Sequence, residues 1–256
     1  LGTMSKIITR RLLSKSKSVG IWSVLAAPTV SEVIGSSDFD WVLFDCEHGP
    51  NQPYNLMAQL NAVKANGINT LCFVRTGDND IIEIKRILDL GVDGIMIPMI
   101  SSAKEAELVV NFCTYPPQGL RGTAGICRAS KYGKRENYLE TAREEVFIII
   151  QVETIDGIKN LESILQVDGI DAVFIGPSDL AASMGYTGKM DSPEVTDVID
   201  SALSKILKSE KIAGTIALDE DSALSFFNKG FQFVAVAHDA HLISSYLDQT
   251  IKAYRN

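Results

Sequence analysis

The sequence is poor in cysteine and histidine and has no surplus of basic charge. Its 256 residues include four Cys and three His. The cysteines form no C-x-x-C pair, which argues against a disulfide framework or a zinc ribbon and favours a reducing, cytoplasmic setting. Lys and Arg number 24 against 32 Asp and Glu, for a net charge of −8. A nucleic-acid partner is not expected, because such proteins usually carry the opposite charge balance.

Long hydrophobic runs are also missing. A membrane-spanning helix needs roughly 18 to 20 apolar residues. The longest candidate, Phe147 to Val152, is far shorter and contains Gln151. The sequence therefore predicts no membrane span.

The N-terminal stretch is basic and rich in serine, and no acidic residue precedes Glu32. Such a composition is compatible with a transit peptide, but a short amphipathic helix that covers one end of the fold is favoured. The apolar residues that share one face of this helix are Ile7, Ile8, Leu12 and Leu13. Residues 1–3 precede Met4 and are left out of the fold prediction.

Eight short apolar runs are predicted to be β-strands. Most are almost continuously hydrophobic, which is typical of strands buried on both faces. They are Val19–Ser23, Trp41–Asp45, Leu71–Arg75, Gly94–Pro98, Val146–Glu153, Ala172–Gly176, Ile212–Ile216 and Gln232–Val236.

Helical patterns alternate with these strands. They cover Gln52–Lys64, Asp80–Leu90, Ser102–Phe112, Gly157–Leu165, Pro193–Ser209, Glu220–Asn228 and His241–Tyr254. Eight strands that alternate with helices predict parallel pairing, and at this length a closed (β/α)8 barrel that forms a single domain over residues 1–256. The alternative is an open doubly wound sheet. It is disfavoured because no G-x-G-x-x-G follows the first strand.

One connection is unusually long. The 47 residues between Pro98 and Val146 include a Gly-rich segment at residues 119–125. Long loops in a compact domain are usually functional or disordered.

Polar residues follow four of the predicted strands. In a (β/α)8 barrel, catalytic groups lie at the C-terminal ends of the strands. The groups at these ends are the loop Asp45–Pro50, Arg75, the pair Gln151 and Glu153, and the pair Ser178 and Asp179.

Glu153 and Asp179 come from adjacent strands and should converge at the barrel mouth. Two carboxylates that lie this close repel each other, unless one is protonated or a divalent cation lies between them. Oxygen ligands of this kind suit Mg²⁺ or Mn²⁺. The alternative is that each carboxylate caps a helix.

His48 lies in a strand-end loop beside Asp45 and Glu47, whose charges favour the raised basicity and fixed tautomer that a general base needs. The alternative for His48 is a structural imidazole. Arg75 ends an apolar strand and needs an anion, which is either a structural partner or a substrate oxyanion. His238 and His241 flank the start of the last helix, where a surface or helix-terminal role is favoured.

Four motifs, taken together, resemble the HpcH/HpaI family of class II, metal-dependent 2-keto acid aldolases. The resemblance extends from about Ser18 to Leu247. The motifs occur in the family's order: D-C-E-H-G-P at Asp45–Pro50, Arg75, Q-V-E-T at Gln151–Thr154, and F-I-G-P-S-D-L at Phe174–Leu180.

The resemblance implies a (β/α)8 barrel of the phosphoenolpyruvate/pyruvate type. It also implies that Glu153 and Asp179 bind Mg²⁺, Mn²⁺ or Co²⁺, and that a pyruvate unit chelates this cation. The pyruvoyl group would also contact Gln151 and the amides of Ser178 and Asp179.

The implied reaction cleaves a 4-hydroxy-2-oxo acid into pyruvate and an aldehyde through a metal-bound pyruvate enolate. Arg75 would neutralise the enolate oxygen. His48 would act as the base, directly or through a metal-linked water. No Lys ends a core strand, as a Schiff-base aldolase would require. The alternatives are an oxaloacetate decarboxylase or lyase that uses the same enolate, and a non-catalytic barrel.

Asp89 matches the family residue that raises the basicity of the catalytic histidine. It lies near the end of a predicted helix, and this end faces the bottom of the barrel, so we expect it to reach only the His48 of a neighbouring subunit. The family forms hexamers, as trimers of dimers that exchange C-terminal helices, which is compatible with such a site.

Two segments depart from the family pattern. The last strand ends in Ala237-His238-Asp239, where the family commonly has Gly-Ser-Asp. The larger, titratable side chain of His238 at that mouth would alter what the aldehyde end of the substrate contacts. The long loop contains Arg128, which is either a surface residue or a contact for an acidic substrate tail. The identity of the substrate therefore stays open.

Overall fold

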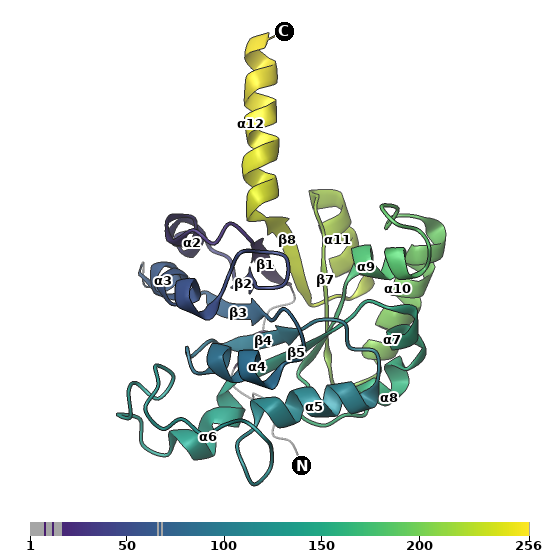
Figure 1. Ribbon diagram of the computed structural model, residues 1–256. Helices are drawn as coiled ribbons and strands as arrows, with labels where there is room; N and C mark the ends of the chain where they lie inside the picture. Colours follow the sequence, from purple (N-terminus) through teal and green to yellow (C-terminus); the bar gives the residue numbers. More distant parts are fainter. Residues whose placement is uncertain (1–7, 9–11, 13–16, 66, 68, 256) are drawn as a thin grey trace.

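Eight parallel strands close into one barrel in the order of the sequence, as predicted (Figure 1). The structure is a computed structural model that describes residues 8, 12, 17–65, 67 and 69–255. The strands are β1 (Ser18–Ser23), β2 (Trp41–Asp45), β3 (Leu71–Arg75), β4 (Gly94–Ile97), β5 (Phe147–Val152), β6 (Ala172–Ile175), β7 (Ile212–Ile216) and β8 (Phe233–His238). The bounds of β2, β3 and β7 agree with the prediction, those of β1, β4, β5 and β6 differ by one residue at one or both ends, and β8 runs two residues further than expected.

Helices connect the strands and surround the barrel. They are α2 (Pro28–Gly35), α3 (Pro53–Lys64), α4 (Ile81–Leu88), α5 (Ala103–Cys113), α6 (Tyr138–Glu145), α7 (Ile155–Lys159), α8 (Leu161–Leu165), α9 (Pro177–Ser183), α10 (Pro193–Ile206), α11 (Glu220–Lys229) and α12 (Asp239–Arg255). The sequence did not predict α2 and α6, because eight residues are too few for a clear helical period. The helix start expected at Pro177 is confirmed by α9. The predicted helix Gly157–Leu165 is divided at Asn160 into α7 and α8.

Aromatic side chains fill the inside of the barrel. The ring of Trp41 stacks on Phe233 with 3.9 Å between centroids, and Phe73 contacts both rings. Gly20 gives room to this layer, because a Cβ there would lie 2.0 Å from the Trp41 ring. The interior is therefore a packed core, and the open mouth of the barrel lies above it.

Alternation along the strands places polar groups above this core. Side chains two residues apart point the same way. In β3, Leu71 and Phe73 belong to the interior cluster, so Arg75 follows them inward. The same alternation brings Asp45 of β2 and Gln151 of β5 to the mouth.

The C-terminal helix α12 projects away from the barrel (Figure 1). It has 17 residues, and all of its side chains from His241 onward are exposed. Within the described residues, no helix is both long and apolar enough to cross a membrane.

The predicted N-terminal helix lies largely outside the described residues. Ile8 and Leu12, its two described members, are buried in the cluster that fills the barrel interior.

Candidate active site

Arg75 is held between two carboxylates at the end of β3. Its Nε and Nη2 donate to the two carboxylate oxygens of Asp45 at 2.9 and 2.7 Å, and its Nη1 lies 2.7 Å from Glu47 Oε2. The guanidinium also lies over the Trp22 ring, 4.8 Å from its centroid. Burial opposes the charge of Arg75, but the hydrogen bonds and charges of Asp45 and Glu47 outweigh it and raise its pKa.

Asp45 organises both Arg75 and the loop that carries His48. Burial alone would raise the pKa of Asp45, but the hydrogen bonds and charge of Arg75 hold it below its usual value. Asp45 Oδ1 also accepts from the backbone N–H groups of Glu47 and His48, at 3.0 and 3.3 Å. His48 itself is 65% exposed, and its Nε2 lies 3.9 Å from Glu47 Oε2. The imidazole is therefore open to a ligand while its backbone is fixed.

Glu153 is a buried carboxylate directly behind the mouth. Its Oε1 accepts from the N–H of Met99 at 2.9 Å, and its Oε2 accepts from Gln151 Nε2 at 2.5 Å. Burial raises the pKa of Glu153 to about 7, and the negative charges of Asp179 and Glu47 add to this effect.

Gly176 lets the next strand approach this carboxylate. A Cβ at Gly176 would lie 2.3 Å from Glu153 Oε2. The short helix α9 begins immediately afterwards and brings Ser178 and Asp179, both exposed, to the same mouth.

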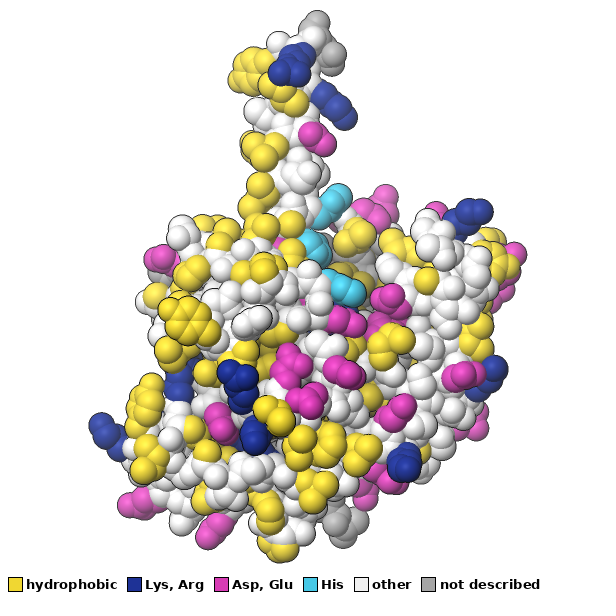
Figure 2. Space-filling model, in the orientation of Figure 1, with side chains coloured by type: hydrophobic (Ala, Val, Ile, Leu, Met, Phe, Trp, Pro, Cys, Tyr) yellow, Lys and Arg dark blue, Asp and Glu magenta, His cyan; other side chains and the backbone are white. Residues whose placement is uncertain are grey.

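These groups surround a cavity of about 480 Å³ at the C-terminal ends of the strands. Figure 2 shows the histidine side chains close together at the foot of α12, beside a hollow that acidic side chains border. The cavity combines one buried cation with several carboxylates and an accessible imidazole. It includes, among others, Asp45, His48, Arg75, Gln151, Ser178 and Asp179.

The alternative that these carboxylates cap helices is not what the structure shows. Thr154, not Glu153, caps α7, by accepting from the N–H of Gly157. The N-cap of α9 is Gly176, and Asp179 lies inside its first turn. Neither acid is therefore the N-cap residue of a helix.

Asp89 lies apart from this mouth. It is the C-cap residue of α4, and its Oδ1 lies 2.7 Å from Nη2 of the fully buried Arg121. In the described part of the chain, no hydrogen bond connects Asp89 with His48. This agrees with the expectation that Asp89 does not reach the histidine of its own chain, and its contact with a neighbouring subunit stays a prediction.

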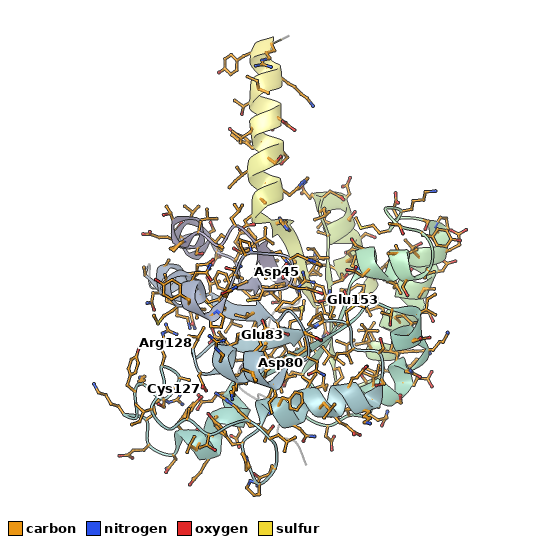
Figure 3. All side chains as sticks on the ribbon, in the orientation of Figure 1. Asp45, Asp80, Glu83, Cys127, Arg128 and Glu153 are labelled. Carbon is orange, nitrogen blue, oxygen red and sulfur yellow. The ribbon has the colours of Figure 1, made fainter. Side chains whose placement is uncertain are left out.

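Arg128 also lies away from the mouth. Figure 3 places it with Cys127 on the long loop at the side of the barrel, at a distance from Glu153. Its Nη2 donates to Asn61 at 2.7 Å, and its Nη1 donates to the carbonyl of Leu90. Within one chain the structure thus favours the surface interpretation of Arg128.

Sequence reasoning left several cavity residues without a role. Asp45 and Glu47 were noted only as neighbours of His48, although the inward alternation of β2 and β3 pairs Asp45 with Arg75. Trp22 and Phe174 line the cavity, as does His238, for which a surface or helix-terminal role was expected. The expected helix-terminal role is confirmed, because Nδ1 of His238 accepts from the backbone N–H of His241 at 3.4 Å at the start of α12. The continuation of β8 to His238 also brings this side chain to the mouth.

The buried Glu153 gives a prediction for the pH dependence of stability. Between pH about 4.5 and 7, folded Glu153 keeps a proton that the unfolded chain has lost, so the free energy of unfolding should fall as the pH rises. The fall should amount to as much as about 3 kcal/mol in the absence of divalent cations. Urea unfolding in EDTA across this range, for the wild type and Glu153→Gln, measures it. Parallel curves for the two proteins would contradict the shifted pKa.

The fold and the site together define a class of protein. A (β/α)8 barrel whose strand ends gather a buried arginine, an accessible imidazole and paired carboxylates in one cavity has the architecture of a barrel enzyme for anionic small molecules.

Comparisons with known proteins assign the family. Residues 18–245 match the profile of the HpcH/HpaI aldolase/citrate lyase family. The chain is 39% identical over 245 residues to a hydroxypyruvate/pyruvate aldolase of Cupriavidus necator, which covers 95% of this chain and 90% of that protein. It is 37% identical to a 4-hydroxy-2-oxo-heptane-1,7-dioate aldolase of Escherichia coli, covering 88% of this chain and 86% of that protein.

A solved structure agrees with these matches. The crystal structure of an HpcH/HpaI aldolase/citrate lyase family protein from Burkholderia cenocepacia superposes with a TM-score of 0.94 at 30% identity, over 98% of this chain and 99% of that one. The chain belongs to the HpcH/HpaI aldolase/citrate lyase family. It is a carbon–carbon lyase, and the predicted family and barrel fold are confirmed.

Proposed function

We propose that the protein cleaves 4-hydroxy-2-oxo acids into pyruvate and an aldehyde, and catalyses the reverse condensation. The observation that carries the proposal is the convergence of Arg75, Gln151 and Asp179 on one cavity, with Glu153 directly behind it. The names of the relatives in Cupriavidus necator and Escherichia coli point to the same chemistry.

The donor set fits a divalent cation. Glu153 is buried with a raised pKa, and the nearby charge of Asp179 raises it further, so a cation between the two acids would offset an unfavourable concentration of negative charge. Two carboxylates are the usual protein contribution to such a site, the other positions being left to substrate and water. Among the described residues, no group of three or more His, Cys, Asp or Glu side chains that could hold a metal ion is present, at this site or elsewhere, so the proposed protein ligands are two.

Glu153 and Asp179 would therefore hold Mg²⁺, Mn²⁺ or Co²⁺. Such a cation supplies a Lewis acid that stabilises negative charge on the oxygen of the 2-oxo group.

The chain's own residues bind the oxo acid and orient it. The guanidinium of Arg75 faces the cavity and offers positive charge to the oxygen on which charge develops. Gln151 lies beside it, with its Oε1 3.4 Å from Arg75 Nη1. The backbone amides of Ser178 and Asp179, in the first turn of α9, bind the substrate carboxylate.

His48 moves the proton. In the cleavage direction its imidazole accepts the proton of the C4 hydroxyl, the C4 oxygen becomes the aldehyde carbonyl, and the C3–C4 bond breaks. The electron pair of that bond passes to the pyruvate part as an enolate, which then takes up a proton at C3. Because Asp45 fixes the loop that carries His48, the imidazole and Arg75 stay in one arrangement.

A panel of substrates tests the proposal. Pyruvate release is measured from several 4-hydroxy-2-oxo acids with added Mn²⁺, and from oxaloacetate in parallel. Cleavage of the hydroxy acids is expected. Pyruvate from oxaloacetate alone would instead assign a decarboxylase, and no release from any compound would indicate a non-catalytic barrel.

We also propose that α12 packs against another subunit. Its exposed apolar residues recur at helical spacing, and an isolated amphipathic helix gains little stability in water. These residues are Leu242, Ile243, Tyr246, Leu247, Ile251 and Tyr254. A homo-oligomer, as in the hexamers that the family resemblance implies, would bury this face.

Removal of α12 after Ala240 is expected to dissociate the oligomer and leave the barrel folded. The truncation keeps Asp239, which anchors the start of the helix. Leu247→Asp should weaken assembly, and Gln249→Asp, a matched charge on the same helix, should not. Light scattering after size-exclusion chromatography measures the mass. An unchanged mass for the truncated protein would contradict this role.

The predicted cytoplasmic location stays a prediction. The four cysteines are free thiols, and Cys72 and Cys113 are buried.

A further inference from the structure

His238 reaches the active-site cavity because of an irregularity in β8. Along β8, Phe233 and Ala235 belong to the interior cluster, so regular alternation would turn Ala237 inward. The pairing with β1 instead shifts: Gly20 pairs with Ala235, but Ile21 pairs with Ala237. Such a bulge re-aims the side chains that follow it. Ala237 accordingly joins the outer cluster, and His238 lines the cavity.

The imidazole of His238 is anchored on one side. Its Nδ1 accepts from the backbone N–H of His241 at 3.4 Å and lies 3.8 Å from Asp239 Oδ1. Asp239 in turn accepts hydrogen bonds from the side chain of Ser23 and from the backbone of Val24, which fixes the foot of α12 to β1.

A neutral histidine that accepts at Nδ1 carries its proton on Nε2. In the described part of the chain, this Nε2 has no hydrogen-bond partner. His238 therefore has an N–H group available to a ligand in the cavity.

The closed barrel places His238 on the side away from Arg75 and Gln151. Arg75 ends β3 and Gln151 lies near the end of β5, and each of these strands is three strands away from β8 around the barrel. An oxo acid bound at Arg75 and Gln151 would therefore extend its other end toward His238.

Besides Asp239 and the other histidine side chains, which Figure 2 shows close by, His238 faces an apolar wall. The wall on this side of the cavity consists of Trp22, Met190, Ile216 and Leu218. The N–H of His238 is thus a donor that faces an apolar wall of the cavity. Such a donor lets a site distinguish substrates that carry a hydroxyl from those that lack it.

We infer that His238 is a specificity-determining residue that selects aldehydes with an oxygen next to the carbonyl group, such as hydroxyaldehydes, over alkyl aldehydes. The inference rests on the proposed aldolase activity. His238 donates from Nε2 to that oxygen, while Arg75, Gln151 and His48 act on the pyruvate part and on the reacting bond.

Condensation of pyruvate with two aldehydes of equal size tests the inference. Glycolaldehyde and propanal differ in one position, where a hydroxyl replaces a methyl group. The wild type is expected to prefer glycolaldehyde in kcat/KM. His238→Leu should lower the glycolaldehyde-to-propanal ratio about tenfold, the value of one neutral hydrogen bond. His238→Gln should restore much of the preference, because its amide N–H reaches a position close to that of Nε2.

The controls separate the possible failures. His241→Leu changes the neighbouring exposed histidine and should keep the wild-type ratio, and propanal turnover in His238→Leu shows that this variant is folded. An unchanged ratio in His238→Leu would overturn the role of His238 and leave the aldolase proposal intact. If the wild type condenses pyruvate with neither aldehyde and does not exchange the methyl protons of pyruvate with D₂O, both proposals fail.

Discussion

Chelation of divalent cations is expected to abolish aldol cleavage, and Mn²⁺ or Mg²⁺ should restore it. The reaction creates a carbanion next to a carbonyl group, whose charge must be delocalised onto a cation or onto a Schiff base. A Schiff base requires a lysine, and the residues that line the cavity in the described part of the chain include none. Pyruvate release with and without EDTA, followed by addition of each cation, measures the effect.

Two controls make this result specific. Unfolding of the chelated protein should stay cooperative, which shows that activity is lost at the site and not through loss of the fold. Incubation with pyruvate and borohydride should not inactivate the enzyme. Activity that survives EDTA and is trapped by borohydride would contradict the account and indicate a Schiff-base aldolase.

His48→Ala is expected to lower kcat for cleavage by about 10² to 10⁴, the usual contribution of a general base. The side chain is 65% exposed, so its removal leaves no buried cavity and should change stability little. Cation affinity should also stay close to that of the wild type, because Glu153 and Asp179 are unchanged. Steady-state kinetics and calorimetry of the same preparation separate these properties.

His241→Ala provides a matched control on the neighbouring α12, where the imidazole is also exposed. It should retain wild-type kcat. A His48→Ala variant with near-wild-type kcat would show that another group serves as the base.

The strands could be predicted because their residues are apolar almost without interruption, as in β2 and β5. The position of polar side chains at the C-terminal ends of the strands also predicted which of them meet at the mouth. Arg75 was expected to need an anion, and the structure supplies two, Asp45 and Glu47. Their identity depends on how β2 and β3 are paired, which apolar patterning alone does not give.

His238 shows where regular alternation fails, although its place at the mouth was expected from the family pattern. One extra residue in β8 reverses the alternation, and the sequence contains no glycine or proline there to indicate a bulge. Helix α12 is a second case. Its amphipathic pattern predicted a helix correctly, but the same pattern is compatible with packing on its own barrel, and the structure shows that it projects away.

The most direct test of the central claim is calorimetric titration of Mn²⁺ into the cation-free protein. The account predicts one binding site per chain in the wild type and a strong loss of affinity in Glu153→Gln and in Asp179→Asn. Asp197→Asn removes one exposed carboxylate of α10 and should bind as the wild type does. Equal Mn²⁺ affinity in all four proteins would contradict the claim that Glu153 and Asp179 hold the cation.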